Sequence, residues 1–245
     1  EDALRGLEEV LHRLRSAGLK VKPSKCRLLQ EKIAFLGHVI SRAGVECDPE
    51  KLQTIAQMKP PTDLTAVRAF LGFVGYYRRF IPRFAELAAP LNALLQKDAR
   101  FGWGKGQQQG FDRLRETLLT EPILSYLEMA WEFVLRTEAS ALAVSETLFQ
   151  ERGGEPQVIA HASFAVRGPQ RNYCSTKRDL LAVVVIIHHF RHYLWGQKFR
   201  LQAPGEAVTW LVNHQEATGM LARWVARLAT YDYGLEEPVT EEGRR

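Results

Sequence analysis

The chain has 245 residues, of which 46% are hydrophobic and 25% are charged, and its formal net charge at pH 7 is +5. This length allows one large domain or two to three small ones, and the apolar content is ample for buried cores. The longest apolar run, residues 180–187, is far shorter than the roughly 20 residues that span a membrane. The acidic, amphipathic N-terminus is not a signal peptide. We therefore expect a soluble intracellular protein, without distinction between nucleus and cytoplasm.

Two further features of the composition bear on partners and ligands. The excess of positive charge favours a polyanionic partner, although a surplus of this size is also common in proteins that never bind nucleic acid. Cys26, Cys47 and Cys174 are widely separated and form no CxxC pair. This spacing argues against a zinc knuckle or a disulfide framework, so we expect reduced thiols.

The first section of the chain comprises residues 1–58. Apolar residues at helical spacing predict a helix of about four turns that stops at Gly18. Alternating β-branched and aromatic residues in the segment 19–47 predict a β-hairpin with its turn at Ala43 and Gly44. A short helix then completes the section.

The second section, residues 59–127, begins with two successive prolines, which mark a domain boundary. Thr62 or Asp63 can cap a helix that runs to about Phe80, and two more helical segments follow. Residues 59–115 contain ten Lys and Arg against four Asp and Glu, a local net charge of +6. The positive charge of the chain is therefore concentrated in this helical section.

Three residues of the first helix in this section recur every four positions: Arg68, Gly72 and Tyr76. This spacing places them along one stripe of the helix. A glycine in such a stripe lets another backbone come close, and arginine and tyrosine can contact phosphate and sugar. In the alternative interpretation, Gly72 serves helix packing and the arginines of the section only face water.

The third section, residues 128–245, alternates strands and helices. Strands are predicted near residues 131–137, 143–150, 157–164 and 198–203, and helices near 174–194, 205–213 and 218–231. Consecutive strands followed by a strand reached through a long helix indicate an α/β layer with a mixed sheet. Thr176 and Asp179 have the spacing of a capping box at the start of the long helix.

Some of the histidines are candidate metal ligands. His188 and His192 are one helical turn apart, but no third ligand of known proximity accompanies them. We expect both to be surface or packing residues. His38 and His161 lie in predicted hairpin segments and are expected to pack.

Several longer segments follow one another along the chain. They read KCRLLQEKIAFLGHVIS, DPEKLQTI, VRAFLGFVGYYRRFIPRFAELAAPLNALLQK, RNYCSTKRDLLAVV and LARWVARLATYDY. In this order, over residues 11–233, they resemble the Pol polyprotein of gypsy-type LTR retrotransposons and their retroviral relatives. The resemblance implies three domains: a palm remnant of reverse transcriptase at 1–58, a helical thumb or connection at 59–127, and a ribonuclease H-like α/β domain with a mixed sheet at 128–245.

The resemblance also implies a nucleic-acid-binding surface in two parts, a primer-grip turn in the palm remnant and a thumb helix that follows the minor groove. The residues at these positions are Phe35, Leu36, Gly37, His38, Arg68, Gly72, Tyr76 and Arg78. We expect weak, sequence-insensitive binding of an RNA–DNA or DNA duplex, with the rest of a Pol-like polyprotein as a further partner and no membrane.

The catalytic positions depart from the family pattern. Two-metal phosphodiester hydrolysis needs carboxylates that converge on two Mg²⁺ ions roughly 4 Å apart. Where the family reads TDAS, this chain reads TEAS, which puts Glu138 at the first metal-bridging aspartate; Asp179 stands at the helix glutamate. Where the family reads TDHRAL, this chain reads APGEAV, so that Pro204 replaces the third carboxylate. A proline cannot coordinate a metal, and we expect these three residues to lie together at one end of the sheet.

Other catalytic features of the family are also missing. The glycines of the second strand are replaced by Ala143, Val144 and Ser145, and no aspartate follows Asp232. The paired-aspartate motif of the polymerase does not occur in the chain. We therefore expect neither polymerase nor nuclease activity and no cofactor, as in a pseudoenzyme within a larger or host-domesticated polyprotein that binds nucleic acid or acts as a scaffold.

Two alternatives stay open. The chain could be a working Mg²⁺-dependent ribonuclease H that cuts the RNA strand of RNA–DNA hybrids with Glu138, Asp179 and Glu206. Against this, Glu206 lies two residues beyond the family position, where its place near a helix start explains an acid without any metal. The chain could also come from a decayed element with no selected function.

Overall fold

The computed structural model describes residues 2–28, 30–120, 122–213 and 218–237. The chain divides into two compact units, Glu1–Ile33 and Ala34–Arg245. The first unit contains α1 (Asp2–Ser16) and a short 3₁₀ helix, η1 (Pro23–Lys25). The predicted N-terminal helix is thus confirmed, and none of the residues of α1 is buried. The predicted domain borders after residues 58 and 127 stay predictions.

A small sheet contains the predicted hairpin. Its strands, in sheet order, are β1 (Lys32–Phe35), β2 (His38–Ser41) and β3 (Gly44–Cys47). β2 and β3 are antiparallel with Ser41 opposite Gly44, which confirms the hairpin, although its turn residues are Arg42 and Ala43, one position earlier than predicted. The prediction did not separate β1, which leads into β2 through a second tight turn at Leu36 and Gly37. Both turn residues have a positive φ, 47° and 74°.

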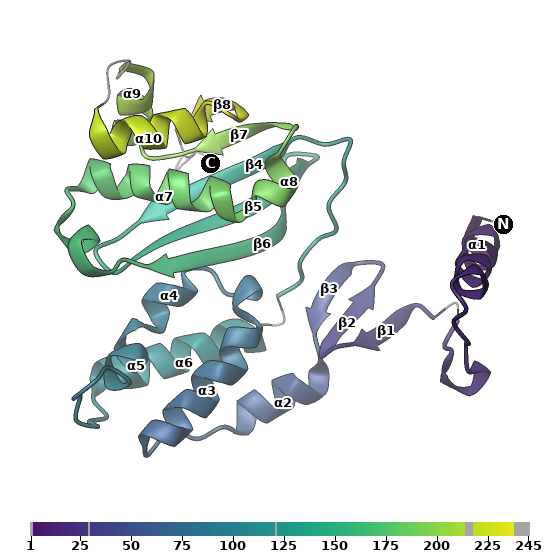
Figure 1. The fold of residues 1–245 in the computed structure, drawn as a ribbon. Coiled ribbons are helices and arrows are strands. Elements are labelled where there is room, and N and C mark those ends of the chain that lie inside the picture. The colour runs from purple at the N-terminus through teal and green to yellow at the C-terminus, as the bar shows by residue number, and fades with distance from the viewer. Residues whose placement is uncertain (1, 29, 121, 214–217, 238–245) are drawn as a thin grey trace. The chain divides into compact units, whose positions relative to one another are not determined.

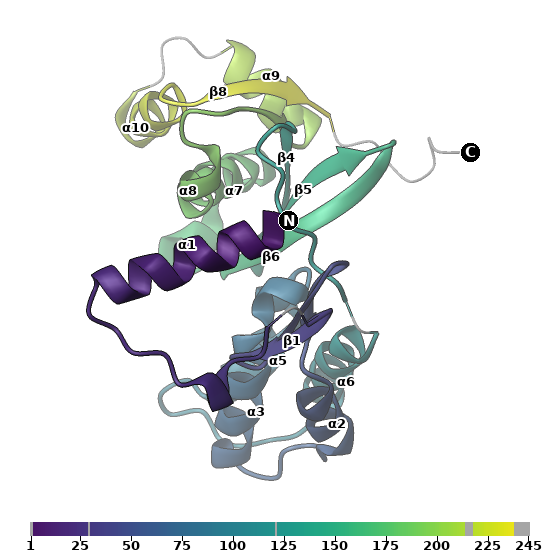
Figure 2. The same ribbon diagram turned by 90° about the vertical axis from the view of Figure 1, so that its right-hand side faces the viewer.

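Helices α2 to α6 form a helical region, and α2, α3, α5 and α6 gather into one group in Figure 2. The elements are α2 (Pro49–Gln57), α3 (Leu64–Tyr76), η2 (Arg78–Phe80), α4 (Phe84–Leu87), α5 (Ala89–Leu94) and α6 (Lys105–Leu119). Asp63 is the N-cap of α3, because its Oδ1 accepts the Ala66 N–H at 2.8 Å. In the core, the rings of Phe70 and Phe111 are 4.6 Å apart.

The rest of the chain forms a sheet domain. Its elements are β4 (Phe133–Ala139), β5 (Ala143–Arg152), β6 (Glu155–Ala165), η3 (Gly168–Asn172), α7 (Ser175–His189), α8 (Arg191–Leu194), β7 (Lys198–Gln202), α9 (Gly205–Asn213), α10 (Gly219–Leu228) and β8 (Asp232–Glu236). The strand order is β6-β5-β4-β7-β8 (Figure 1). β7 is parallel to both β4 and β8, whereas the β4–β5 and β5–β6 pairs are antiparallel. The predicted α/β architecture with a mixed sheet is therefore confirmed, and β8 is an addition to it.

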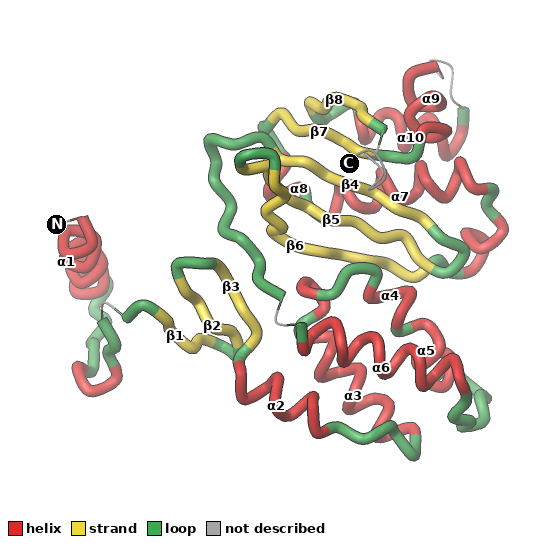
Figure 3. The backbone as a smooth tube through the Cα atoms, turned by 180° about the vertical axis from the view of Figure 1, so that it is seen from behind, coloured by secondary structure: helices red, strands yellow, loops and turns green. Residues whose placement is uncertain are grey.

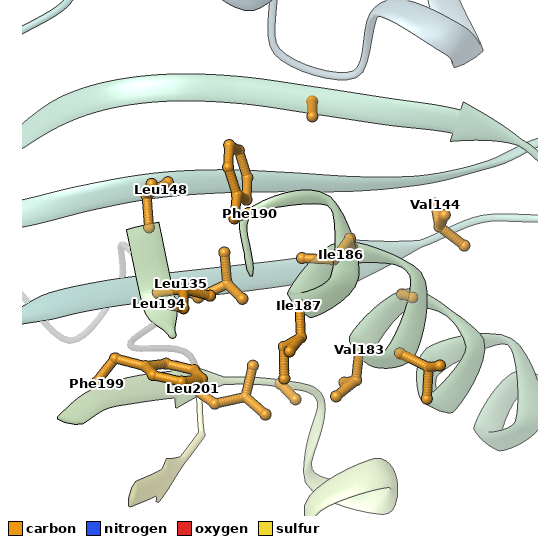
Figure 4. Packing of buried hydrophobic residues seen from close by; sticks show 14 of the residues in the cluster. Leu135, Val144, Leu148, Val183, Ile186, Ile187, Phe190, Leu194, Phe199 and Leu201 are labelled. Atoms are coloured by element: carbon orange, nitrogen blue, oxygen red, sulfur yellow. The ribbon is translucent and has the colours of Figure 1, made fainter. Parts of the chain in front are cut away.

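The core of the sheet domain lies between the sheet and α7 (Figure 4). Leu135 and Leu148 project from adjacent strands toward Val183, Ile186 and Ile187 of α7, and all five side chains are buried. The alternation of a strand assigns the other side chains of β4 to the opposite face. Figure 3 shows the sheet from the side opposite α7.

The helical region packs against the sheet domain through the edge strand β6. The backbone N–H of Ala85 in α4 donates to the Ser163 Oγ at 2.8 Å. Val158, also on β6, packs against the core of the helical region. Both α4 and η2 contact β6, so these two parts of the second unit share an interface.

Two details of the predicted helix 174–194 are wrong. The helix divides into α7 and α8 at Phe190. Its N-cap is Cys174, and Thr176 makes no capping bond, because its hydroxyl donates to Glu206 Oε2 at 2.7 Å instead. Among the described residues, no helix is both long and apolar enough to cross a membrane.

Candidate nucleic-acid interface and candidate nuclease site

Glu138 lies near the end of β4, directly opposite Ser145 of β5. Its side chain is exposed, whereas Leu135 of the same strand is fully buried beneath α7. Because successive side chains of a strand point to opposite faces, Glu138 projects from the face that α7 does not cover.

A cavity of about 270 Å³ lies beside Glu138. The residues that line it are Arg83, Glu86, Glu138, Ala139, Ser140, Ala143, Ser145 and Pro204. Glu138 and Pro204 share this wall because β4 and β7 are parallel neighbours, so that their carboxyl ends meet at one edge of the sheet. The structure thus brings two of the three family positions together.

Arg83 and Glu86, from the helical region, line the same cavity and were not predicted as site residues. Arg83 Nη2 lies 2.7 Å from Glu86 Oε2, and its Nε donates to the same oxygen at 2.9 Å. Arg83 has a φ of 55°, a left-handed conformation that is uncommon outside glycine. The sequence could not reveal this pair, because only the docking of α4 against the sheet domain places it beside Glu138.

Asp179 has different surroundings. It is nearly buried on α7 and is not among the described residues that line this cavity. Burial raises the pKa of its carboxyl, and the charge of Glu206 raises it further, while Arg178 opposes the shift. Asp179 therefore interacts with Glu206, on the first turn of α9, and that residue also accepts the Thr176 hydroxyl.

A further acid, Glu237, lies beside the turn that contains Pro204. A side-chain Cβ built on Gly205 would come within 2.6 Å of Glu237 Oε1. This proximity follows from β8, which runs parallel to β7 and ends at the same edge. Glu237 was not predicted as a site residue, because β8 was not predicted as a strand.

A pair of Mg²⁺ ions sets a strict requirement on the acids at this end of the sheet. Such a site needs several carboxylates around a shared pair of metals, in near-ideal octahedral geometry. Here Glu138 projects from one face of the sheet, Asp179 interacts with Glu206, and the side chain of Pro204 has no ligand atom. Within residues 2–28, 30–120, 122–213 and 218–237, no group of three His, Cys, Asp or Glu residues could hold a metal ion.

Two other titratable groups lie in the sheet, of which Glu146 is buried and His161 is half-buried. Glu146 of β5 has no hydrogen-bond partner for either carboxylate oxygen, and burial raises its pKa well above the ordinary value, with Arg78 partly opposing. His161 of β6 shares a 2.9 Å hydrogen bond between its Nδ1 and the Thr147 hydroxyl. Burial lowers the pKa of His161 to about 4. The expectation that His161 packs is confirmed.

On α3, Arg68, Gly72 and Tyr76 are all exposed. A Cβ built on Gly72 would meet nothing within 4 Å, so this glycine serves no close packing with the described residues. The packing interpretation of Gly72 is therefore wrong. Arg78, on η2, is also exposed, but its charge acts on Glu146 and His189 of the sheet domain.

The turn between β1 and β2 lies against the end of α3. The Tyr76 hydroxyl donates to the Leu36 carbonyl oxygen, and the Tyr77 hydroxyl donates to the Gly37 carbonyl oxygen at 2.9 Å. The His38 ring packs against Tyr76, Tyr77 and Phe80. His38 is thus a packing residue, as expected, while Phe35 and Leu36 are exposed.

Comparison with known proteins gives consistent matches in sequence. A family model described as an RNase H-like domain found in reverse transcriptase matches residues 103–201. The retrovirus-related Pol polyprotein from transposon 297 of Drosophila melanogaster is 34% identical over 95% of this chain and 22% of its own length. The Tf2-3 polyprotein of Schizosaccharomyces pombe is 30% identical over 93% of this chain and 17% of its own length. The chain thus spans about a fifth of the length of the curated relatives it matches.

Solved structures give the same result for the fold. A foamy viral protease-reverse transcriptase in complex with dsDNA superimposes with a TM-score of 0.77 at 20% identity, over 98% of this chain and 52% of that chain. The same protein in complex with an RNA/DNA hybrid gives a TM-score of 0.76 over 98% of this chain and 34% of that chain, also at 20% identity.

The fold and these matches define the class as a reverse transcriptase segment with a ribonuclease H-like domain. More narrowly, over nearly its whole length the chain is similar to a segment of retrotransposon Pol polyproteins, and residues 103–201 match the ribonuclease H-like domain found in reverse transcriptase.

Proposed function

We propose that this region is catalytically inactive and acts as a nucleic-acid-binding or scaffolding segment of a Pol-like polyprotein. The observation that carries the proposal is the state of the family's carboxylate positions. Pro204 shares a cavity with Glu138 and supplies no ligand, while Asp179 interacts with Glu206. Catalytic groups must be held within about 0.5 Å of a productive geometry. A set in which one position is a proline and another acid interacts with Glu206 does not provide such a geometry.

A nuclease assay tests this proposal. The purified chain is incubated with a labelled RNA–DNA hybrid in Mg²⁺ or Mn²⁺, beside a Glu138→Ala variant. We expect the two proteins to give the same background. Metal-dependent cleavage that disappears in Glu138→Ala would overturn the inactive assignment.

One observation favours the alternative, an active ribonuclease H: the charge of Glu206 acts on Asp179, so these two acids are electrostatic neighbours. If cleavage is found, Glu206→Gln tests this alternative directly. A working site built on Glu138, Asp179 and Glu206 would lose activity in that variant, whereas a capping or hydrogen-bonding role for Glu206 would leave the rate of cleavage largely unchanged.

Duplex binding is the activity that the helical region supports. The stripe on α3 is exposed, the space in front of Gly72 is open, and residues 59–115 carry a local net charge of +6. The similar foamy viral proteins were solved in complex with dsDNA and with an RNA/DNA hybrid. We infer weak, sequence-insensitive binding of such a duplex, with a dissociation constant of roughly 10⁻⁴ to 10⁻⁶ M at physiological salt.

Binding is tested by titrating a labelled RNA–DNA hybrid at several salt concentrations. Phosphate contacts release counterions, so affinity should fall steeply with salt. Combining Arg68→Ala with Arg78→Ala should weaken binding and flatten the salt dependence, by a slope of about one for each arginine that binds a phosphate. Arg167→Ala, an exposed arginine of the sheet domain, is the matched control. Absence of binding at low salt, or an unchanged slope in the double variant, would contradict the proposal.

A further inference from the structure

We propose that Tyr76 and Tyr77 are positioning residues that hold the Leu36-Gly37 turn on the end of α3, so that the turn and the exposed face of α3 meet a duplex as one surface. The proposal rests on the proposed duplex binding. It begins from two hydrogen bonds across 40 residues of sequence, from the adjacent tyrosine hydroxyls to the two successive carbonyl oxygens of the turn.

The backbone of the turn needs such support. Leu36 has a φ of 47°, a left-handed conformation that is unfavourable for a non-glycine residue. Gly37 also has a positive φ, and a Cβ at this position would come within 3.1 Å of the Tyr77 hydroxyl. Two-residue hairpin turns of this kind favour asparagine or aspartate before the glycine, so Leu36 is a poor choice for the turn itself.

Two further kinds of contact hold the turn in place, a backbone hydrogen bond and the packing of the His38 ring. The Asp48 N–H donates to the Gly37 carbonyl oxygen at 3.2 Å. The His38 ring centroid lies 5.3 Å from that of Tyr76 and 5.5 Å from that of Tyr77. The tyrosine rings and the histidine thus form a small aromatic layer beneath the turn.

The side chains of the turn face outward from this layer. Phe35 is 57% exposed and Leu36 is 71% exposed, so neither contributes to a core. A strained turn that carries an exposed leucine is better explained by a contact made outside the protein than by folding. Apolar side chains suit the sugar and base faces of a nucleic acid, whereas arginine suits its phosphates.

Tyr76 therefore has a different role from the one that the sequence suggested. Its hydroxyl donates a hydrogen bond to the Leu36 carbonyl oxygen, so it is engaged within the protein instead of contacting phosphate. Arg68, two stripe positions away, keeps the phosphate role. The two roles predict different responses to salt, because only phosphate contacts release counterions.

The test compares three variants of the full chain in duplex titrations over a range of salt. Tyr76→Phe combined with Tyr77→Phe removes both hydroxyls and keeps the rings. We expect a loss of affinity of roughly tenfold, because both hydrogen bonds to the turn are lost, with an unchanged salt slope. Arg68→Ala should flatten the slope. Tyr126→Phe is the matched control, since its hydroxyl donates at 2.8 Å to the Ser41 carbonyl oxygen at the other turn of the same sheet.

Hydrogen exchange of the free protein supplies an independent measurement. The amides of residues 35–38 should exchange faster in the double tyrosine variant and at the native rate in Tyr126→Phe. If the wild-type chain binds no duplex while exchange still accelerates, duplex binding is refuted and the positioning role of the tyrosines stands. Unchanged exchange together with unchanged affinity overturns the positioning role. A flattened salt slope in the double tyrosine variant also overturns it, because that result would mean that the hydroxyls contact phosphate.

If the double variant fails to fold, the single Tyr76→Phe change replaces it, with the same expected pattern at smaller size. The Tyr77 hydroxyl then still holds the Gly37 carbonyl oxygen.

Discussion

The helical region and the sheet domain have complete cores but differ in the chemistry that remains on their surfaces. In the helical region, buried residues such as Phe70 and Phe111 support a face that still presents Arg68 and an open Gly72. In the sheet domain, an equally closed core leads to strand ends where Pro204 shares a cavity with the exposed Glu138. Core packing depends on the apolar pattern, so a fold can persist after the residues of its site have changed.

The largest expected effect tests whether the two cores are equally well packed. Phe111 and Phe133 are 0% and 1% exposed, one in each region. Replacing either with alanine should lower the free energy of unfolding by about 3–5 kcal/mol, measured by urea denaturation. Leu142→Ala, at an exposed position, should change it by less than about 0.5 kcal/mol. A much smaller cost for Phe133→Ala would mean that the sheet core has loosened along with its site.

The next effect is a pH dependence that originates in the sheet domain. The folded-state pKa of His161 is about 4, below the ordinary 6.5, because burial disfavours the charged ring. Stability from this group is therefore complete above pH 6.5 and declines as the pH falls toward 4, by about 3 kcal/mol at most. Unfolding curves at pH 7.5 and 5 should differ less for His161→Gln than for wild type. If the free energy of unfolding changes equally between the two pH values in wild type and in His161→Gln, other groups cause the acid sensitivity.

A smaller effect is expected where two helices come close in the helical region. A Cβ at Gly110 would lie 2.7 Å from the Leu87 carbonyl oxygen, which is backbone and cannot move freely. Gly110→Ala should therefore destabilise the chain by about 1–3 kcal/mol, despite the better helix propensity of alanine. Thermal unfolding measures this change, and a stabilised variant would show that α4 and α6 separate easily.

The smallest effect has the opposite sign for stability. Gly72 lies in the interior of α3 with open space around it, so Gly72→Ala should stabilise the chain by about 0.5–1 kcal/mol. If a duplex backbone approaches this glycine, the same change should weaken binding severalfold. A variant that is more stable and binds as tightly as wild type would remove Gly72 from the interface.

The sequence was sufficient for features that depend on local pattern. Periodicity indicated α1, α3 and the strands β4 to β7. Thr62 or Asp63 was readable as the cap of α3, and the structure uses Asp63. β8 was missed because its five residues carry no turn signal of their own, and the pairing with β7 that defines it is tertiary. The capping role of Thr176 failed for a similar reason, since Glu206 competes for its hydroxyl from another helix.

For the site, motifs located Glu138, Asp179 and Pro204 in the chain but could not give their neighbours. Arg83 and Glu86 reach the cavity only through docking of α4, and Glu237 reaches Gly205 only through the parallel strands. Glu146 reads as an ordinary polar residue of an alternating strand, yet it is buried without a hydrogen-bond partner. These features depend on contacts between distant segments, which residue types and spacing do not specify.

The docking of the helical region on β6 has a consequence for aggregation. β6 is an 11-residue strand at the edge of the sheet, and an uncovered edge of this length is a template for pairing with other chains. In the intact protein, η2 and α4 pack against β6, and the Ala85 N–H donates a hydrogen bond to the Ser163 hydroxyl. A fragment that begins at residue 128 would keep every strand of the sheet but uncover this edge and Val158. We expect such a fragment to self-associate. In the intact protein, the helical region therefore protects the sheet edge from aggregation.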